Sequence, residues 1–264
     1  MTTAAAELQT RLASEAEHFD RHYQEEQARG VGPLSSFDRT RYAAPSADTV
    51  YPREYFFHLL NPKPGMKMLE IACGNGIDAS IAAVNGADVF AYDLSPQAID
   101  MTRRRAAANG VSERVHTMVS CEIEDAFSGQ TFDAITGYAA LHHLPLQGLG
   151  ERVCARLKPG GVAVFAEPVV NSDALARLRN MLPIRPADVT PDERPLNDAD
   201  ITELARSFGG RVTRREFQCV SRVYPLLPQW WPLIASLHHL DAGLMRLPAL
   251  RKFASVVVFS LTRA

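Results

Sequence analysis

The residues best suited to hold a ligand lie around Gly74 and Gly76, which are separated only by Asn75. An apolar run precedes them and a helical pattern follows, so the spacing predicts a strand, a tight turn and a helix. Glycine has no Cβ, so a ligand can lie against bare backbone. The free amides at the helix start can receive a carboxylate or a phosphate. This pattern indicates a small-molecule site.

Asp93 ends a second apolar run that follows this loop. One carboxylate can accept hydrogen bonds from both hydroxyls of a ribose. The series Gly74-x-Gly76-x-x-Ala79, with an acidic residue about 20 positions on, also fits the dinucleotide fingerprint. The loop and Asp93 therefore leave open an NAD-dependent oxidoreductase beside other enzymes that bind an adenosine ribose.

Side chains that could move a proton follow two later apolar runs. Tyr138, His142 and His143 come after the fourth run, and Glu167 ends the fifth. The carboxyl ends of parallel strands form the edge at which open α/β sheets bind ligands. Histidine is matched to proton transfer near neutral pH, so the pair are candidate general bases. The alternative is a structural role in which they bind the loop backbone.

An alternation of apolar runs with helical stretches begins at Met66 and could position these residues. This alternation is typical of a parallel sheet that helices cover on both faces. The preceding residues predict a charged helix over 3–29, an irregular stretch over 33–52 and a short helix over 53–60. Strands are expected at 67–72, 87–92, 115–119, 132–136, 162–166, 211–223 and 254–262, and helices at 77–85, 96–109, 149–157 and 198–208.

Composition argues against several classes of partner. The chain has 264 residues and a formal net charge of -2, which gives no electrostatic reason to expect nucleic acid. The four cysteines form no C-x-x-C pair, so we expect reduced thiols and no metal. The apolar run at 255–261 is far shorter than the ~20 residues that span a bilayer. The charged N-terminal stretch does not fit a signal peptide. We expect a cytoplasmic protein with no integral membrane segment.

Five blocks follow one another in order. They are Leu-Glu-Ile-Ala-Cys-Gly-Asn-Gly at 69–76, Tyr-Asp-Leu-Ser at 92–95, Phe-Asp-Ala-Ile-Thr at 132–136, Ala-Leu-His-His-Leu at 140–144 and Leu-Lys-Pro-Gly-Gly at 157–161. At these spacings the series resembles the class I S-adenosylmethionine-dependent methyltransferase family over residues 66–167. The resemblance implies a Rossmann-like, doubly wound α/β sheet of seven strands whose last strand is antiparallel. It also implies methyl transfer from S-adenosylmethionine, which yields S-adenosylhomocysteine. A non-catalytic S-adenosylmethionine-binding protein stays open.

The resemblance implies roles for individual residues. Glu70 would orient the methionine end of the cofactor, and the backbone of 72–76 would lie along its amino and carboxylate groups. Asp93 would bind the ribose, Leu94 would pack on the adenine, and the residues after the third strand would read the adenine edge. The implied cofactor-binding residues are Glu70, Ala72, Cys73, Gly74, Asn75, Gly76, Asp93, Leu94, Glu122 and Ile123.

The chain departs from the family pattern at two places. Ala72 stands where the family usually has its first glycine, which is tolerable only if φ at Ala72 is negative. Ser120-Cys121-Glu122 replaces the usual Gly-Asp, so the adenine contact could shift by one residue from Glu122. The residues after the fourth strand also lack the Asn/Asp-Pro-Pro-Tyr motif of methyltransferases that act on nucleic-acid and protein amide nitrogens. A small-molecule acceptor is expected.

The acceptor pocket is expected from segments outside the blocks, namely 37–55, 168–195 and 225–252. Tyr42 and Tyr51 would supply aromatic walls, Glu167 a polar group, and Trp230 and Trp231 an apolar cap. Packing of the cap onto the sheet is the alternative. This predicts an N-terminal helical lid segment over 1–61 and a core over 62–264, with cap insertions at about 168–197 and 225–252. A largely apolar acceptor, from secondary metabolism or lipid-like, would suit this composition.

Overall fold

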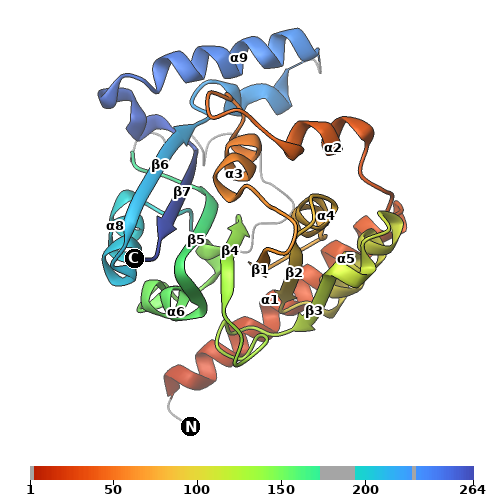
Figure 1. Ribbon diagram of the computed structural model, residues 1–264. Coiled ribbons are helices and arrows are strands. Elements are labelled where there is room, and N and C mark those ends of the chain that lie inside the picture. The colour runs from red at the N-terminus through yellow and green to blue at the C-terminus, as the bar shows by residue number, and fades with distance from the viewer. Residues whose placement is uncertain (1–2, 173–193, 228–229) are drawn as a thin grey trace.

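The computed structural model describes residues 3–172, 194–227 and 230–264. Its centre is a seven-stranded sheet in the order β3-β2-β1-β4-β5-β7-β6 (Figure 1). The five strands from β3 to β5 run parallel, whereas β7 is antiparallel to both β5 and β6. The predicted doubly wound α/β fold with an antiparallel last strand is confirmed. The strands are β1 Lys67–Ile71, β2 Asp88–Asp93, β3 Val115–Val119, β4 Phe132–Tyr138, β5 Leu157–Pro168, β6 Arg211–Phe217 and β7 Val256–Thr262.

Helices cover both faces of the sheet, because its central strands are apolar on both sides. One hydrophobic cluster packs α3, α4 and α5 against the sheet, and a second packs α6 and α8 against the opposite face. Within the described ranges, no helix is long and apolar enough to cross a membrane. The α-helices are α1 Thr3–Ala28, α2 Ser36–Ala43, α3 Pro52–Leu60, α4 Ile77–Val84, α5 Pro96–Ala108, α6 Leu149–Arg156, α8 Asp198–Phe208 and α9 Trp231–Leu244, and the 3-10 helices are η1 Ser112–Arg114, η2 Leu141–His143, η3 Ser221–Leu226 and η4 Pro248–Phe253.

Two local predictions were wrong. The stretch 33–52 was expected to be irregular, but it contains α2, whose first turn is capped by the Ser35 hydroxyl accepting from the Asp38 amide at 3.0 Å. The strand expected over 211–223 ends at Phe217, because Gln218 takes a left-handed φ of 58° that no strand continues. The 3-10 helix η3 then begins at Ser221.

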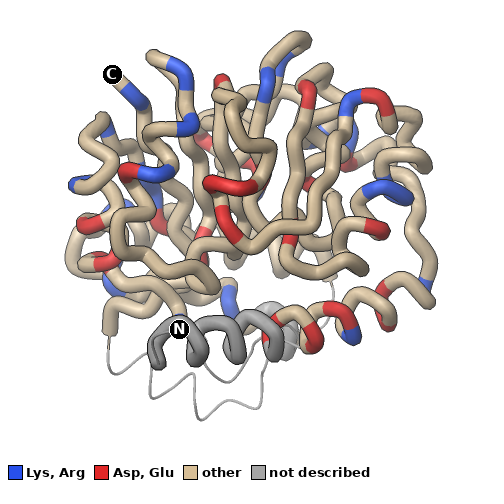
Figure 2. Tube along the Cα trace, turned by 90° about the horizontal axis from the view of Figure 1, so that it is seen from below, with Lys and Arg blue, Asp and Glu red and all other residues tan. Residues whose placement is uncertain are grey.

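The long helix α1 lies along one side of the body rather than in either layer (Figure 2). Polar contacts tie it to α5. The Gln27 amide donates to the Asp100 carboxylate at 2.6 Å, and the Asp20 carboxylate accepts from the Ser95 hydroxyl at the start of α5. α1 thereby runs past the carboxyl ends of the central strands.

Candidate functional site

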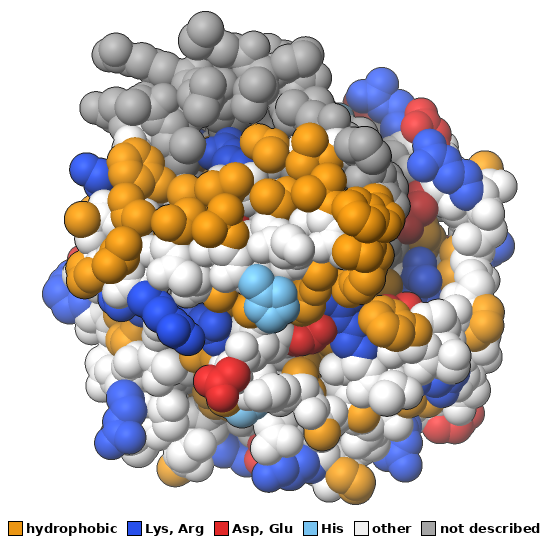
Figure 3. All heavy atoms as spheres, turned by 90° about the horizontal axis from the view of Figure 1, so that it is seen from above, with side chains coloured by type: hydrophobic (Ala, Val, Ile, Leu, Met, Phe, Trp, Pro, Cys, Tyr) orange, Lys and Arg blue, Asp and Glu red, His pale blue; other side chains and the backbone are white. Residues whose placement is uncertain are grey.

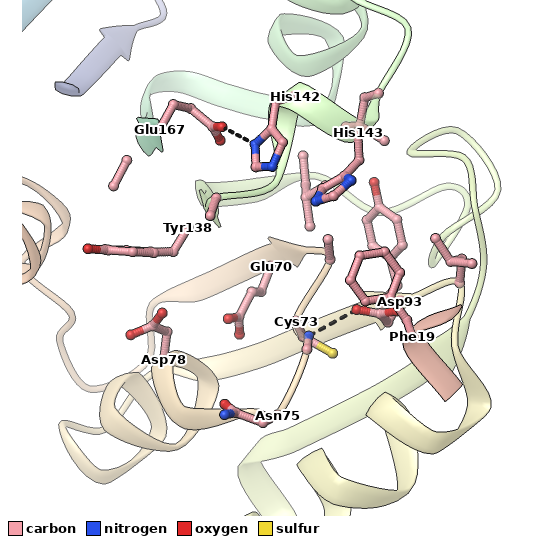
Figure 4. A pocket seen from close by; sticks show the side chains of 18 of the residues that line it. Phe19, Glu70, Cys73, Asn75, Asp78, Asp93, Tyr138, His142, His143 and Glu167 are labelled. Carbon is pink, nitrogen blue, oxygen red and sulfur yellow. Dashed lines mark hydrogen bonds and ion pairs between the residues drawn. The ribbon is translucent and has the colours of Figure 1, made fainter. Parts of the chain in front are cut away.

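A cavity of about 420 Å³ opens at the carboxyl edge of the sheet. Its walls come from the segments that follow β1, β2, β3, β4 and β5, together with residues of α1 and α3. The labelled side chains in Figure 4 lie around it, with Glu167 and Tyr138 at one end and Asp93 and Phe19 at the other. The predicted residues that line it are Glu70, Ala72, Cys73, Gly74, Asn75, Asp93, Leu94, Tyr138, His142, His143 and Glu167.

The loop after β1 turns through three left-handed residues. Gly74 has φ of 53° and Gly76 has φ of 73°, as glycine allows. Ala72 also has a positive φ, of 50°, so the prediction of a negative φ was wrong. In this conformation the next residue, Cys73, donates its amide to the Tyr92 carbonyl of β2 at 3.1 Å. Ala72 therefore holds a conformation that costs an alanine roughly 1 kcal/mol.

Gly76 serves packing rather than the cavity. It is not among the described residues that line the cavity. A Cβ on Gly76 would lie 2.6 Å from the Thr102 Cα of α5, so only glycine lets the loop meet that helix. The structure thus gives Gly76 a packing role against α5, and its contact with the cofactor stays a prediction.

Asp93 organises the loop as well as lining the cavity. Its two carboxylate oxygens accept from the Gly74 amide at 2.9 Å and from the Ser95 amide at 2.9 Å. Burial raises the pKa of this carboxyl, and the two amide hydrogen bonds oppose the rise. Leu94, the next residue, also lines the cavity.

A buried charge cluster that the sequence did not indicate lies below the loop. Glu70 is 4% exposed, and its Oε2 has no hydrogen-bond partner among the described residues. Burial, and then the Asp78 charge, raise the pKa of Glu70 well above its ordinary value. Arg53 of α3 lies 3.2 Å from the Asp78 carboxylate. Burial, the largest single influence, lowers the pKa of Arg53, but Asp78 together with Tyr138 and Tyr42 outweighs it and the pKa is raised. The cluster combines two carboxylates with one permanent cation.

The residues after β3 differ from the prediction. Glu122 and Ile123 are not among the described residues that line the cavity, whereas Ser120 and Cys121 are. The Ser120 hydroxyl donates to the Glu122 carbonyl at 3.1 Å and thereby closes a tight turn. This turn directs the Glu122 carboxylate toward Arg152 at 3.4 Å, while Ile123 is buried in the core. The adenine-side prediction therefore moves to Ser120 and Cys121.

His142 and Glu167 form a hydrogen-bonded pair at the other end of the cavity (Figure 4). The distance from His142 Nδ1 to Glu167 Oε2 is 2.8 Å. The second carboxylate oxygen accepts from the Ala140 and Leu141 amides at 2.9 and 2.8 Å, and the Glu167 side chain is 0% exposed. An ionised carboxylate can only accept, so His142 donates from Nδ1 and carries its basic lone pair on Nε2.

His143 and Tyr138 face different parts of the cavity. The His143 ring makes an edge contact with Phe19 of α1 at 5.3 Å between centroids, and its charge opposes the rise in the pKa of Asp93. Tyr138 lies at the opposite end, where the Arg53 guanidinium sits 4.3 Å from its ring centroid. His142, in contrast, is held by the buried Glu167 carboxylate.

The predicted aromatic walls lie elsewhere. The cavity-lining residues of the described chain do not include Tyr42, Tyr51, Trp230 or Trp231. Tyr42 is buried against Phe57 in the core. Tyr51 stacks on Trp231 with 5.9 Å between ring centroids, and both tryptophans are more than half exposed. The predicted cap over the acceptor is therefore corrected. Most of the other predicted insertion, 168–197, lies outside the described residues.

α1 supplies residues that the motifs did not indicate. Phe19 and Tyr23 line the cavity, and a Cβ on Gly74 would lie 2.7 Å from the Tyr23 hydroxyl oxygen. The Asn75 side chain donates to the Glu26 carboxylate at 2.8 Å. The charge and length of α1 were visible in the sequence, but its partner was not, because helix docking depends on complementary surfaces.

Comparisons with known proteins identify the family. A methyltransferase domain model matches residues 68–161. A ubiquinone biosynthesis O-methyltransferase of Thiobacillus denitrificans is 30% identical over 173 residues, which cover 62% of this chain and 74% of that protein. The chain belongs to the class I S-adenosylmethionine-dependent methyltransferase family. A ubiquinone biosynthesis O-methyltransferase of Xanthomonas axonopodis pv. citri is 35% identical over 138 residues. These residues cover 47% of this chain and 56% of that protein.

Solved structures share the fold of this methyltransferase. Geranyl diphosphate C-methyltransferase of Streptomyces coelicolor, in complex with S-adenosylhomocysteine, has a TM-score of 0.61 at 13% identity and covers 96% of this chain and 98% of its own. Magnesium protoporphyrin IX methyltransferase of Synechocystis, with bound S-adenosylhomocysteine, has a TM-score of 0.57 at 12% identity and covers 96% and 100%. The cofactor of the methyltransferase is S-adenosylmethionine. The glycine loop therefore belongs to a site for S-adenosylmethionine and not to a site for a dinucleotide.

Proposed function

We propose that the methyltransferase acts on a hydroxyl group of a small, largely apolar acceptor, and that His142 takes the hydroxyl proton. The single observation that carries this proposal is the buried Glu167 carboxylate, which holds His142 Nδ1 at 2.8 Å. A hydroxyl is a poor nucleophile until its proton leaves, whereas a neutral amine needs no base. The homologues named for O-methyl transfer support the same choice.

The cofactor is proposed to bind along the loop after β1. Glu70 suits its ammonium group, because a buried carboxylate without a partner is costly unless a cation or a hydrogen-bond donor meets it. Arg53 is the cation nearest to this cluster and suits the carboxylate of the cofactor. Asp93 would bind the ribose, with Leu94, Ser120 and Cys121 on the adenine side. The donors and acceptors present thus fit S-adenosylmethionine.

α1 is proposed to act as a lid over the bound cofactor, as part of the N-terminal segment 1–61. The support is its contacts with both the loop and α5: Asn75 donates to Glu26 at 2.8 Å, and Gln27 donates to Asp100 at 2.6 Å. Phe19 and Tyr23 then close the cavity from the outside. Such closure excludes water, which strengthens the electrostatic interactions inside the site.

The reaction needs little from the protein beyond position and one proton transfer. Bound S-adenosylmethionine supplies a methyl group that is already electrophilic. The cavity walls would hold the acceptor oxygen in line with that group, at the roughly 3–3.5 Å of a near-attack geometry. His142 would accept the hydroxyl proton at Nε2, and the Glu167 carboxylate would stabilise the resulting imidazolium.

The apolar character of the acceptor is inferred from the lining near His142. Leu144, Ala166, Pro168, Pro195 and Val256 lie on the same cavity as His142. Ligand pockets of this kind select shape and apolar area, with few polar contacts to orient the ligand. We place the reaction in secondary metabolism, in the cytoplasm, on a lipid-like or aromatic acceptor.

A methyl-transfer assay with labelled S-adenosylmethionine tests the proposal. Matched pairs of apolar phenols and the corresponding anilines should show turnover of the phenols only. Calorimetry with S-adenosylhomocysteine should give micromolar affinity, about -8 kcal/mol. Asp93→Ala should lose about 1.5–3 kcal/mol of it. Turnover of the anilines would refute the hydroxyl assignment. Tight cofactor binding without turnover across a broad acceptor panel would favour a non-catalytic binding protein.

A further inference from the structure

The helix α9 leaves large apolar side chains exposed on its outer side, while its other leucines and Ile234 are half-buried. Trp231 and Leu240 are 53% and 51% exposed, and Trp230, just before the helix, is 63% exposed. The two side chains that the helix buries, His238 and Asp241, are polar. This arrangement differs from an ordinary surface helix, in which the fully buried side chains are those of the apolar stripe.

Polar and aromatic contacts on the inner side hold α9 in this orientation. The Asp241 carboxylate accepts from the Val220 amide at 2.7 Å and from the Ser221 amide at 2.9 Å. The His238 ring packs on Tyr51 with 4.8 Å between centroids. Turning the apolar face inward would break the contacts of a buried carboxylate, so the outward orientation is built into the fold.

The outward face is continuous and has a basic border. Figure 3 shows a band of hydrophobic side chains across this side of the molecule, with Lys and Arg near its edge. Residues 217–264 contain five basic residues against one acid, the buried Asp241, although the whole chain has a net charge of -2. Arg246, Arg251 and Lys252 are exposed just after α9. A cleft beside α9 is lined in part by Arg246 and Arg251. Among its described lining residues, Asp48 is the exposed acidic one.

We propose that α9 and the basic residues after it dock on the surface of a bilayer that contains anionic lipid. An apolar helix face bordered by cations is the pattern of helices that lie in the membrane interface. Tryptophan is enriched at that depth, and each basic residue near an anionic surface adds attraction. A symmetric contact between two copies would instead gather Arg246, Arg251 and Lys252 of both chains in one interface, with few exposed acids to pair them.

Fluorescence of the full-length protein tests this proposal directly, because its only two tryptophans, Trp230 and Trp231, lie on the proposed surface. Vesicles of equal parts phosphatidylglycerol and phosphatidylcholine should shift the emission to the blue, and brominated acyl chains should quench it. Leu240→Glu with Leu247→Glu should weaken vesicle affinity at least about tenfold, since each leucine loses apolar burial. Neutralising Arg246, Arg251 or Lys252 with Gln should cost about fivefold each.

The control is Val212→Glu, which adds one of the two new charges at an exposed apolar side chain of β6 and should bind vesicles like the parent. Unchanged circular dichroism and S-adenosylhomocysteine affinity would show that the α9 variants are folded. Vesicles of phosphatidylcholine alone should bind much more weakly, and equal binding would overturn the anionic preference. The absence of a blue shift with vesicles would overturn membrane docking. A blue shift without lipid that grows with protein concentration, together with a doubled molecular mass, would also overturn it.

Discussion

Replacing Glu167 with Gln would remove the negative charge beside His142 but keep a side chain of the same size that can form hydrogen bonds. The Gln carbonyl oxygen can still accept from the Ala140 and Leu141 amides, which now donate to Glu167 at 2.9 and 2.8 Å. The amide nitrogen would then face His142 Nδ1 and donate to it. The His142 proton would move to Nε2, so the ring could no longer accept the acceptor's proton there.

The expected cost is the loss of general-base catalysis, a fall in kcat of about 10²–10⁴, or roughly 2.7–5.4 kcal/mol in the barrier. The assay compares kcat, KM and the pH profile of Glu167→Gln, of His142→Gln and of the double variant, with S-adenosylhomocysteine affinity as the control for the site. Affinity should stay within about threefold, because neither residue lies on the glycine loop.

If Glu167 acts through His142, the double variant should be no slower than His142→Gln alone, since residues of one network are not additive. The pH profile of kcat should also change in both single variants. Losses of only a few-fold, or single-variant losses that add in the double variant, would refute the pair and leave catalysis by positioning alone.

Three further predictions concern the cofactor end. The pKa of Glu70 is raised, first by burial and then by Asp78, so the folded state loses stability as pH rises above 4.5, the ordinary pKa of a glutamate. Above neutral pH, Glu70→Gln should therefore increase the free energy of unfolding of the ligand-free protein by about 1 kcal/mol and raise its Tm. The same variant should bind S-adenosylhomocysteine about tenfold or more weakly. A lower Tm would contradict this reasoning. Gly74→Ala places a Cβ 2.7 Å from the Tyr23 hydroxyl, so it should loosen α1, which limited proteolysis would report, and adding Tyr23→Phe should partly restore protection. A double variant as protease-sensitive as Gly74→Ala would remove the α1 explanation. Ala72→Gly relieves a φ of 50° and should change the free energy of unfolding by less than about 1 kcal/mol, because glycine also loosens the unfolded chain, whereas Ala72→Val should lose more than about 2 kcal/mol. Equal denaturation midpoints for the Gly and Val variants would show that φ at this position is not strained.

The sequence was informative where chemistry and local geometry coincide. A buried parallel strand reads as a continuous apolar run, so the strands and their carboxyl ends could be located, and with them Asp93 and His142. The hydrogen bond between His142 and Glu167 could not be predicted. These residues are 25 positions apart, and only the pairing of β4 with β5 brings them together. Sequence order placed both at one edge, but not at 2.8 Å.

Contacts that depend on the complementarity of two surfaces were not predictable. α1 was expected as a charged helix, yet its docking depends on single polar pairs such as Asp20 with Ser95. Arg53 likewise carries no signal in its own segment, because its importance comes from Asp78 on α4. An isolated charge in a sequence is by default a surface charge, and burial becomes visible only when the partner is known.

The segment 225–252 shows why apolar composition alone does not predict direction. A stretch rich in Trp and Leu reads as core or as a pocket wall, since burying these side chains stabilises a fold. In α9 the inner contacts are made by Asp241 and His238, and a carboxylate bonded to two amides outweighs the burial of a leucine when one side must face out. The polar residues therefore determine the orientation of α9, and part of its apolar surface stays exposed. The same reasoning explains why Trp230 and Trp231 lie away from the cavity, and it makes their fluorescence a direct measure of what covers that surface.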